Sequence, residues 1–133
     1  YDKGIGVTRN ASAATKWYAK AAAQGHTRAQ ATVAYMYDTG SGVDADPKRA
    51  ANWYGMAAAQ GDNVAQYNLG AMFESGRGIT QDHIEAHKWF NIAEVNGNKQ
   101  ATDARRLVET LMTPEQIEEA QRRASAWLKS SAR

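Results

Sequence analysis

The feature that most constrains this chain is an internal repeat with a period of 36 residues. Trp17-Tyr18 recurs as Trp53-Tyr54 and again as Trp89-Phe90, each time 36 residues further along. Pairs of glycines separated by one residue keep the same period, at Gly4 and Gly6, Gly40 and Gly42, and Gly76 and Gly78. A constant period of this length is the signature of a solenoid, in which each unit packs against its neighbours.

Each period predicts a pair of helices. In the middle unit Asp46 is a helix cap, and Pro47 follows at the first helical position, where a missing N–H costs nothing. One apolar face then runs through Ala50, Trp53, Tyr54, Ala57 and Ala58, and Gly61 ends the helix. A second helix is expected over residues 63–75, before Gly76. Alanine dominates the apolar residues, which favours helices over strands, so we predict an all-α fold.

The two ends of the chain differ from the middle unit. Tyr1 to Gly4 align with Tyr37 to Gly40, and Asn10 takes the place of the Asp46 cap, so we expect a first repeat truncated at its N-terminus. At the other end Thr113, Pro114 and Gln116 form a capping box, which predicts a terminal helix over residues 113–133. Its apolar stripe is Ile117, Ala120, Ala124, Trp127 and Leu128. The predicted organisation is a repeat array over 1–112 followed by a capping helix.

The combined pattern of Gly-x-Gly, Trp-aromatic and Gln-Gly in a constant register resembles the Sel-one-like repeat, a relative of the tetratricopeptide repeat. The resemblance covers residues 1–112 and implies a right-handed α/α superhelix that acts as a protein-interaction scaffold. It also implies a bacterial protein of the periplasm or cytoplasm, with the periplasm favoured. The last unit departs from the pattern, because Arg105 and Arg106 replace the usual Leu-Gly pair.

Motifs for chemistry are scarce. His83 and His87 stand four residues apart on a predicted helix and so could share a zinc ion, but the Glu of H-E-x-x-H and a third ligand are missing. We therefore expect both histidines on the wet face of the helix. No nucleophile–base pair and no phosphate-binding loop can be proposed, so the expectation is no enzyme, no cofactor and no metal.

The net charge and the hydropathy of the chain limit the kinds of partner that we expect. The net charge is +2, and no basic stripe with interleaved aromatic residues emerges, so nucleic acid is not expected. No window approaches the roughly 18 apolar residues that span a membrane. Cysteine is absent, which excludes disulfides and thiolate chemistry.

Residues that recur in every unit, such as the tryptophans, are expected to pack inside the repeat. Residues that vary from unit to unit on one face are expected to bind a partner. The varying face falls on the helix around Ala29 and on its equivalent 36 residues later, which the resemblance places on the inner, concave surface. The predicted partner-binding residues are Arg28, Thr32, Tyr35, Thr39, Tyr67, Asn68 and Ser75. Tyrosine and arginine often dominate binding energy. The alternative is that Tyr35 and Tyr67 fill the groove between adjacent helices.

The leading hypothesis is a non-catalytic scaffold or adaptor that holds a peptide or a helix of another protein in its concave groove. An alternative is a regulatory or assembly subunit of a bacterial cell-envelope or secretion complex, and a more remote one is a hydrolase-like activity. The exposed edge of the truncated N-terminal repeat also suggests end-to-end association between copies.

Overall fold

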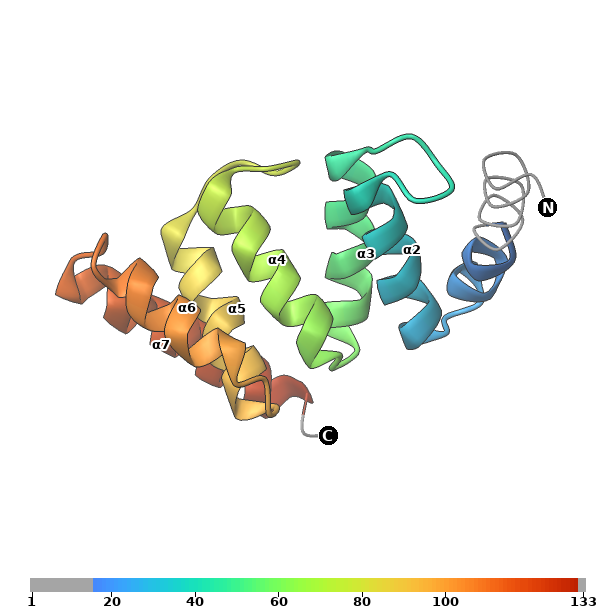
Figure 1. Cartoon of the computed structure of the whole chain (residues 1–133). Coiled ribbons are helices and arrows are strands. Elements are labelled where there is room, and N and C mark those ends of the chain that lie inside the picture. The colour runs from blue at the N-terminus through green and yellow to red at the C-terminus, as the bar shows by residue number, and fades with distance from the viewer. Residues whose placement is uncertain (1–15, 132–133) are drawn as a thin grey trace.

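The computed structural model describes residues 16–131, and these are helical throughout apart from short connections. Residues 16–23 form the first helical segment. It is followed by α2 (Thr27–Thr39), α3 (Pro47–Ala59), α4 (Asn63–Ser75), α5 (His83–Val95), α6 (Gln100–Glu109) and α7 (Pro114–Ser131). No strand occurs in this part of the chain, so the predicted all-α fold is confirmed. Helices 16–23 to α5 stack in chain order, and α7 runs back along the stack so that its end lies by the α3–α4 turn (Figure 1).

The helix starts follow the predicted caps. The Asp46 carboxylate accepts a hydrogen bond from the Arg49 N–H at 3.2 Å, and Asp82 accepts one from Glu85 at 3.1 Å. Asp62, which the sequence analysis did not single out, caps α4 in the same way. Such caps satisfy N–H groups that have no partner inside the helix. The predicted cap Asn10 lies outside the described residues, as do Gly4, Gly6 and the alignment of Tyr1 to Gly4.

The recurring glycines shape the connections between units. Gly76 ends α4 in the left-handed conformation at φ 76°, where a side chain would be strained. Gly78 has a φ of 75°, and a Cβ placed there would lie 2.3 Å from the Pro47 carbonyl oxygen. The loop after α4 therefore lies directly on the start of α3, which explains why the second glycine of the pair recurs.

Alanines bring the helices close together, and large residues fill the remaining space. Tyr54 is 1% exposed and Phe90 2%, and both belong to the core together with Ile92 and Trp89. At Gly70 a Cβ would meet the Phe90 ring at 2.8 Å, so α4 and α5 approach as closely as a glycine allows. The missing side chain of Gly70 is therefore what permits this close contact.

The last helix covers α5. Thr113 and Gln116 exchange two hydrogen bonds, of 2.9 and 3.1 Å, and so form the predicted capping box. Ala120 and Ala124 are buried, and the Trp127 ring meets Trp89 edge-on with centroids 5.6 Å apart. The division into an array over 1–112 and a cap over 113–133 stays a prediction.

Candidate functional site

A small hollow opens where α2, α3 and α4 meet, and it is called the α2–α4 hollow here. It has a volume of about 190 Å³ and is lined by Arg28, Ala31, Thr32, Tyr35, Tyr54, Val64 and Asn68. Tyr54 comes from α3, and the other residues come from the two helices of the predicted binding face. Tyr35 is 58% exposed and Val64 46%, so the hollow has an apolar, solvent-accessible rim.

The seven predicted binding residues lie in three kinds of surroundings. Arg28, Thr32, Tyr35 and Asn68 are brought together around the hollow. Thr39 and Ser75 lie at the ends of their helices, where their hydroxyls donate to the carbonyl oxygens of Tyr35 and Met72.

Tyr67, the remaining predicted residue, packs against Phe90 with ring centroids 5.7 Å apart. Tyr67 therefore packs between adjacent helices, as the alternative interpretation expects. Tyr35, in contrast, is exposed. Whether the face binds a partner stays a prediction.

The repeat explains why the hollow exists between α2 and α4. Ala31 and Tyr67 occupy equivalent positions, 36 residues apart, as do Tyr54 and Phe90. The large Tyr67 side chain of α4 covers Phe90 of α5. One repeat earlier the small Ala31 of α2 lines the hollow, while Tyr54 of α3 stays buried. The smaller residue at the position of Tyr67 therefore leaves room for the hollow.

Tyr54 is the residue of the hollow that sequence reasoning assigned to packing alone. Its ring is buried, but its Oη has no hydrogen-bond partner among the described residues. Burial raises the pKa of the phenol well above its ordinary value, and the charges of Asp38 and Tyr35 raise it further. Arg77 and the Asn68 side chain act in the opposite direction. The phenol thus stays protonated.

One signal in the sequence pointed to this hydroxyl. The second aromatic residue of the recurring pair is Tyr18, Tyr54 and then Phe90, so the repeat itself does not require an oxygen at this position.

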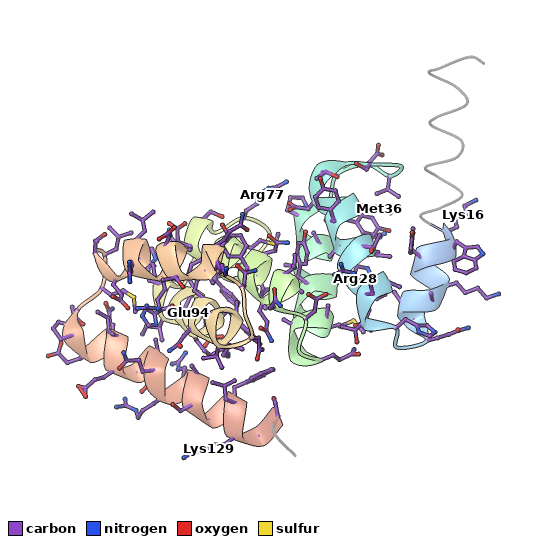
Figure 2. All side chains as sticks on the ribbon, turned by 60° about the horizontal axis from the view of Figure 1, so that its bottom comes forward. Lys16, Arg28, Met36, Arg77, Glu94 and Lys129 are labelled. Carbon is purple, nitrogen blue, oxygen red and sulfur yellow. The ribbon has the colours of Figure 1, made fainter. Side chains whose placement is uncertain are left out.

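The charges around the hollow are only partly paired. The Arg28 side chain is 83% exposed and reaches Asp62 at an N–O distance of 3.7 Å, beyond ordinary hydrogen-bond length. Asp62 is 10% exposed, and its carboxylate also accepts from the Val64 N–H at 3.0 Å. Farther along, Arg77 forms an ion pair with Asp38 and donates to its carbonyl oxygen at 2.8 Å. Figure 2 shows Arg28 on α2 and Arg77 in the loop after α4.

A ladder of buried amides joins successive units and was missed by the sequence analysis. Gln30 donates to the Ala22 carbonyl at 3.2 Å and accepts from Gln60 at 2.7 Å. Thirty-six residues later Gln66 donates to the Ala58 carbonyl at 3.1 Å and accepts from Asn96 at 3.0 Å. Because the same bonds recur at the repeat period, these amides hold the units together. The available signal was an amide side chain at both equivalent pairs, Gln30 with Gln66 and Gln60 with Asn96.

The expectation that both His83 and His87 lie on a wet helix face is wrong for His87. Its side chain is fully buried, and its Nε2 lies 2.7 Å from Glu109 Oε2. Arg105 donates to Glu94 and Glu109 at 2.8 Å each, so it joins α5 to α6 (Figure 2 labels Glu94). Hydrogen bonds from Arg105 and Thr102 hold the pKa of Glu94 below its ordinary value. The arginine that departs from the repeat pattern is therefore structural.

Glu109 belongs to the same network. Burial alone would raise the pKa of its carboxyl, but hydrogen bonds from His87 and Arg105 outweigh it and lower the value. Within the described residues no group of three or more acidic or histidine side chains is arranged to hold a metal ion.

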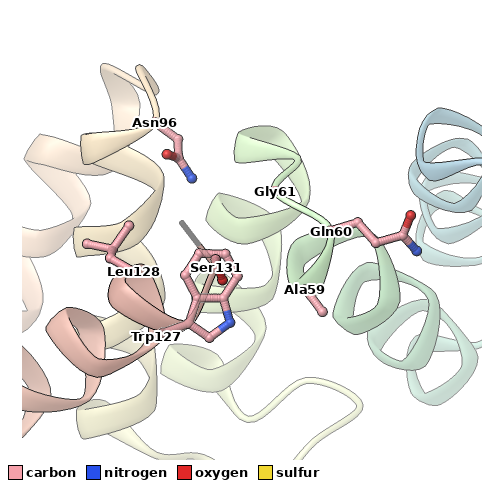
Figure 3. Close-up of a pocket in the computed structure, with 7 residues that line it drawn as sticks. All are labelled: Ala59, Gln60, Gly61, Asn96, Trp127, Leu128 and Ser131. Atoms are coloured by element: carbon pink, nitrogen blue, oxygen red, sulfur yellow. The ribbon is translucent and has the colours of Figure 1, made fainter. Parts of the chain in front are cut away.

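Two other hollows lie outside the predicted face. One is bounded by the α3–α4 turn, the end of α5 and the last turns of α7 (Figure 3). Its amides Gln60 and Asn96 are already engaged in the ladder between units.

The other hollow is lined by Trp17, Lys20, Ala21, Gln24 and His26. The recurring tryptophans were expected to pack inside the repeats. Trp89 is buried and Trp53 is partly buried against the core, whereas Trp17 is 74% exposed. Among the described residues, none of the helices combines the length and apolar character needed to cross a bilayer.

Comparison with known proteins agrees with this architecture. The Sel1 repeat family matches residues 1–26, 27–62 and 63–94. The solved structure of c5321, a protective antigen present in uropathogenic Escherichia coli strains and displaying an SLR fold, is 32% identical with a TM-score of 0.87. That match covers 91% of this chain but 26% of the antigen, so the chain spans about a quarter of that protein. No curated protein matches the sequence.

Two further structures are similar over shorter stretches. A Sel1 repeat protein from Oxalobacter formigenes is 38% identical, covers 68% of both chains and has a TM-score of 0.67. Helicobacter pylori cysteine rich protein B (hcpB) is 23% identical over 68% of both chains, with a TM-score of 0.64, and shows the fold alone. The predicted solenoid of helix pairs is confirmed by these likenesses.

Proposed function

Since this chain belongs to the Sel1 repeat family, we propose that it is a non-catalytic adaptor that holds a segment of a partner protein across the α2–α4 hollow. Proteins built from Sel1 repeats are generally protein-interaction scaffolds. The observation that carries the proposal is the hollow between α2 and α4 with the exposed Tyr35 on its rim. An exposed tyrosine at the edge of a pocket offers a large contact area at low entropic cost.

The chemistry of the lining supports contact rather than catalysis. The hollow presents an amide, two phenols, a threonine hydroxyl and one guanidinium, of which the Thr32 hydroxyl already donates to the Arg28 carbonyl at 2.9 Å. These groups can position a peptide by hydrogen bonds and apolar contact, which is what an adaptor needs. A role as regulatory or assembly subunit of a bacterial cell-envelope or secretion complex would use the same contacts.

A quantitative pull-down tests this proposal. The chain and its Tyr35→Ala variant are used as paired baits in extract of the source cells, and Val95→Ala is the control. Val95 is 61% exposed but lies outside the hollow, at the end of α5. We expect one or more proteins to be retained by the chain and by the control but depleted on Tyr35→Ala. Equal retention by all three baits would move the binding site elsewhere.

We also propose end-to-end contact between copies at the first helical segment, because Trp17 is 74% exposed and Tyr18 37%. Sedimentation of the chain and of Trp17→Ser tests this second contact. Concentration-dependent association that is lost in the variant would support it, and a single monomeric species for both proteins would refute it.

A further inference from the structure

The contact between α5 and α6 uses different chemistry from the equivalent contact between α3 and α4. Five positions, each 36 residues apart in the two contacts, change together. At these positions the earlier contact has Ala51, Ala58, Gln66, Leu69 and Phe73. The later contact has His87, Glu94, Thr102, Arg105 and Glu109. A set without ionisable groups is thus replaced by two carboxylates, a guanidinium and an imidazole.

These side chains of the later contact form one network across the two helices. Arg105 donates to Glu94 and to Glu109 at 2.8 Å each, and Thr102 donates to Glu94 at 2.6 Å. His87 Nε2 lies 2.7 Å from Glu109 Oε2. The Arg105 side chain is 22% exposed and that of His87 is fully buried, so the carboxylates rather than water are their partners.

Apolar burial adds little to the attachment of α6. Of its ten residues only Ala101 and Val108 are buried, whereas α5 buries six of 13. Leu107 on α6 and Leu111 just after it are 68% and 59% exposed. The charged network therefore supplies a larger share of the attachment here than charges do between α3 and α4, where Leu69 is part of an apolar cluster.

The helix after α6 is held on α5 by contacts of its own. The Trp127 ring of α7 meets the Trp89 ring of α5 with centroids 5.6 Å apart, and Arg123 of α7 forms an ion pair with Glu85 of α5 at 2.8 Å. Because α5 and α7 contact each other directly, α6 is a strap whose two ends are both anchored.

The two carboxylates keep this strap closed at neutral pH. Hydrogen bonds from Arg105 and Thr102 lower the pKa of Glu94. Burial opposes ionisation of Glu109, but its bonds to His87 and Arg105 outweigh burial and lower its pKa as well. When both carboxyls take up a proton, the mostly buried Arg105 guanidinium loses both counter-charges, which is costly for the closed contact.

The other groups around the two carboxylates do not replace the lost charges. Arg106 of α6 is a further cation that acts on Glu94. From α4 the Tyr67 ring packs on the same apolar cluster as α6. From α7 Arg123 reaches α5 only near its start, at Glu85, and is paired there. Acid therefore leaves an excess of positive charge between α5 and α6.

We infer that α6 is an acid-labile strap, which protonation of Glu94 and Glu109 releases from α5 while α5 and α7 remain packed. Release uncovers the apolar cluster beneath α6, to which Ala86, Phe90 and Ala93 of α5 belong. The opening is local, because each unit of a repeat array contacts only its neighbours and can open separately from them.

Hydrogen exchange of the whole chain, followed by mass spectrometry between pH 3 and pH 7, tests this inference. The backbone amides of α6 report release of the strap, and those of α4 report opening of the array. Rates are corrected for the intrinsic pH dependence of exchange. As the pH falls below the ordinary glutamate pKa of about 4.3, α6 should lose protection roughly tenfold or more relative to α4 and α7, since each linked proton contributes up to about tenfold per pH unit.

A double variant, Glu94→Gln with Glu109→Gln, keeps the shape of both side chains but has no carboxyl to titrate. We expect its α6 amides to be less protected than those of the chain at pH 7, and their protection relative to α4 to be the same at every pH. The matched control is Glu85→Gln, which removes a paired carboxylate of α5 outside the network. Its α6 amides should show the pH dependence of the unaltered chain.

Three results would overturn the inference. Protection lost in α4, α6 and α7 at one common pH would mean that acid unfolds the whole array and that α6 is no separate strap. Protection of α6 that persists to pH 3 would mean that the carboxylates do not hold it. An undiminished pH dependence of α6 in the double variant would assign the release to other groups.

Discussion

At the scale of single residues, the two tyrosines of the predicted binding face behave differently. Tyr35 is 58% exposed, so Tyr35→Ala should change the free energy of unfolding by no more than roughly 0.5 kcal/mol, as at other surface positions. Tyr67 packs on Phe90 and α6, so Tyr67→Ala should cost about 1–3 kcal/mol, less than a fully buried aromatic. Urea titration of both variants measures the two values. Equal losses would mean that Tyr35 is also a core residue and cannot serve as a binding surface.

The Tyr54 hydroxyl gives a second prediction at this scale. Tyr54→Phe removes an unpaired buried oxygen and keeps the ring, so stability should stay the same or rise by up to about 1 kcal/mol. Thermal and urea unfolding of the variant check this expectation. A loss above about 1 kcal/mol would show that the hydroxyl has a structural partner in the folded chain.

At the scale of helices, the contact between α4 and α5 depends on the missing side chain of Gly70. A Cβ there would meet the Phe90 ring at 2.8 Å and the Ala86 carbonyl oxygen at 3.2 Å, so Gly70→Ala should destabilise by about 1–3 kcal/mol. The matched control is Gly55→Ala in α3, where nothing lies within 4 Å of the added Cβ. That variant should gain about 0.5–1 kcal/mol from helix propensity. If both substitutions stabilise, α4 and α5 do not approach as closely as described.

The attachment of α6 to α5 should depend on pH. The pKa values of Glu94 and Glu109 are lowered in the folded chain, mainly through hydrogen bonds from Arg105, Thr102 and His87. A lowered carboxyl pKa adds stability above the unfolded value of about 4.3, and this stability disappears as the pH falls through the folded values.

Chemical denaturation between pH 3 and pH 7 measures this dependence. We expect Arg105→Met to be less stable than the chain at neutral pH and to converge with it at acidic pH, because the pairing it removes is already lost there. A constant difference between the two proteins at every pH would contradict the assignment of the network to ionised carboxylates.

At the scale of the whole molecule, much of the architecture followed from the repeat. Several predicted features depend on local chemistry, which a sequence shows directly. They are the caps Asp46 and Asp82, the second helix of the middle unit over 63–75 and the capping box at Thr113. The period then placed the same elements in successive units. These features could be predicted because each depends on residues only a few positions apart.

The hollow and the buried histidine could not be predicted for the opposite reason. The hollow lies beside Ala31 of α2, at the position that Tyr67 occupies one repeat later, where Tyr67 packs on Phe90. His87 is buried because Glu109 of α6 reaches its ring, 22 residues further along. Both features depend on contacts between helices, and the helical periodicity of a single segment does not predict such contacts.

The most direct test of the proposed binding site is the retention of partner proteins from source-cell extract by the chain and by its Tyr35→Ala variant, with the melting temperature of both recorded. Because Tyr35 is 58% exposed, we expect Tyr35→Ala to keep the melting temperature of the chain and to lose the proteins that the chain retains. A folded Tyr35→Ala variant that retains the same proteins in the same amounts would contradict the assignment of binding to the α2–α4 hollow.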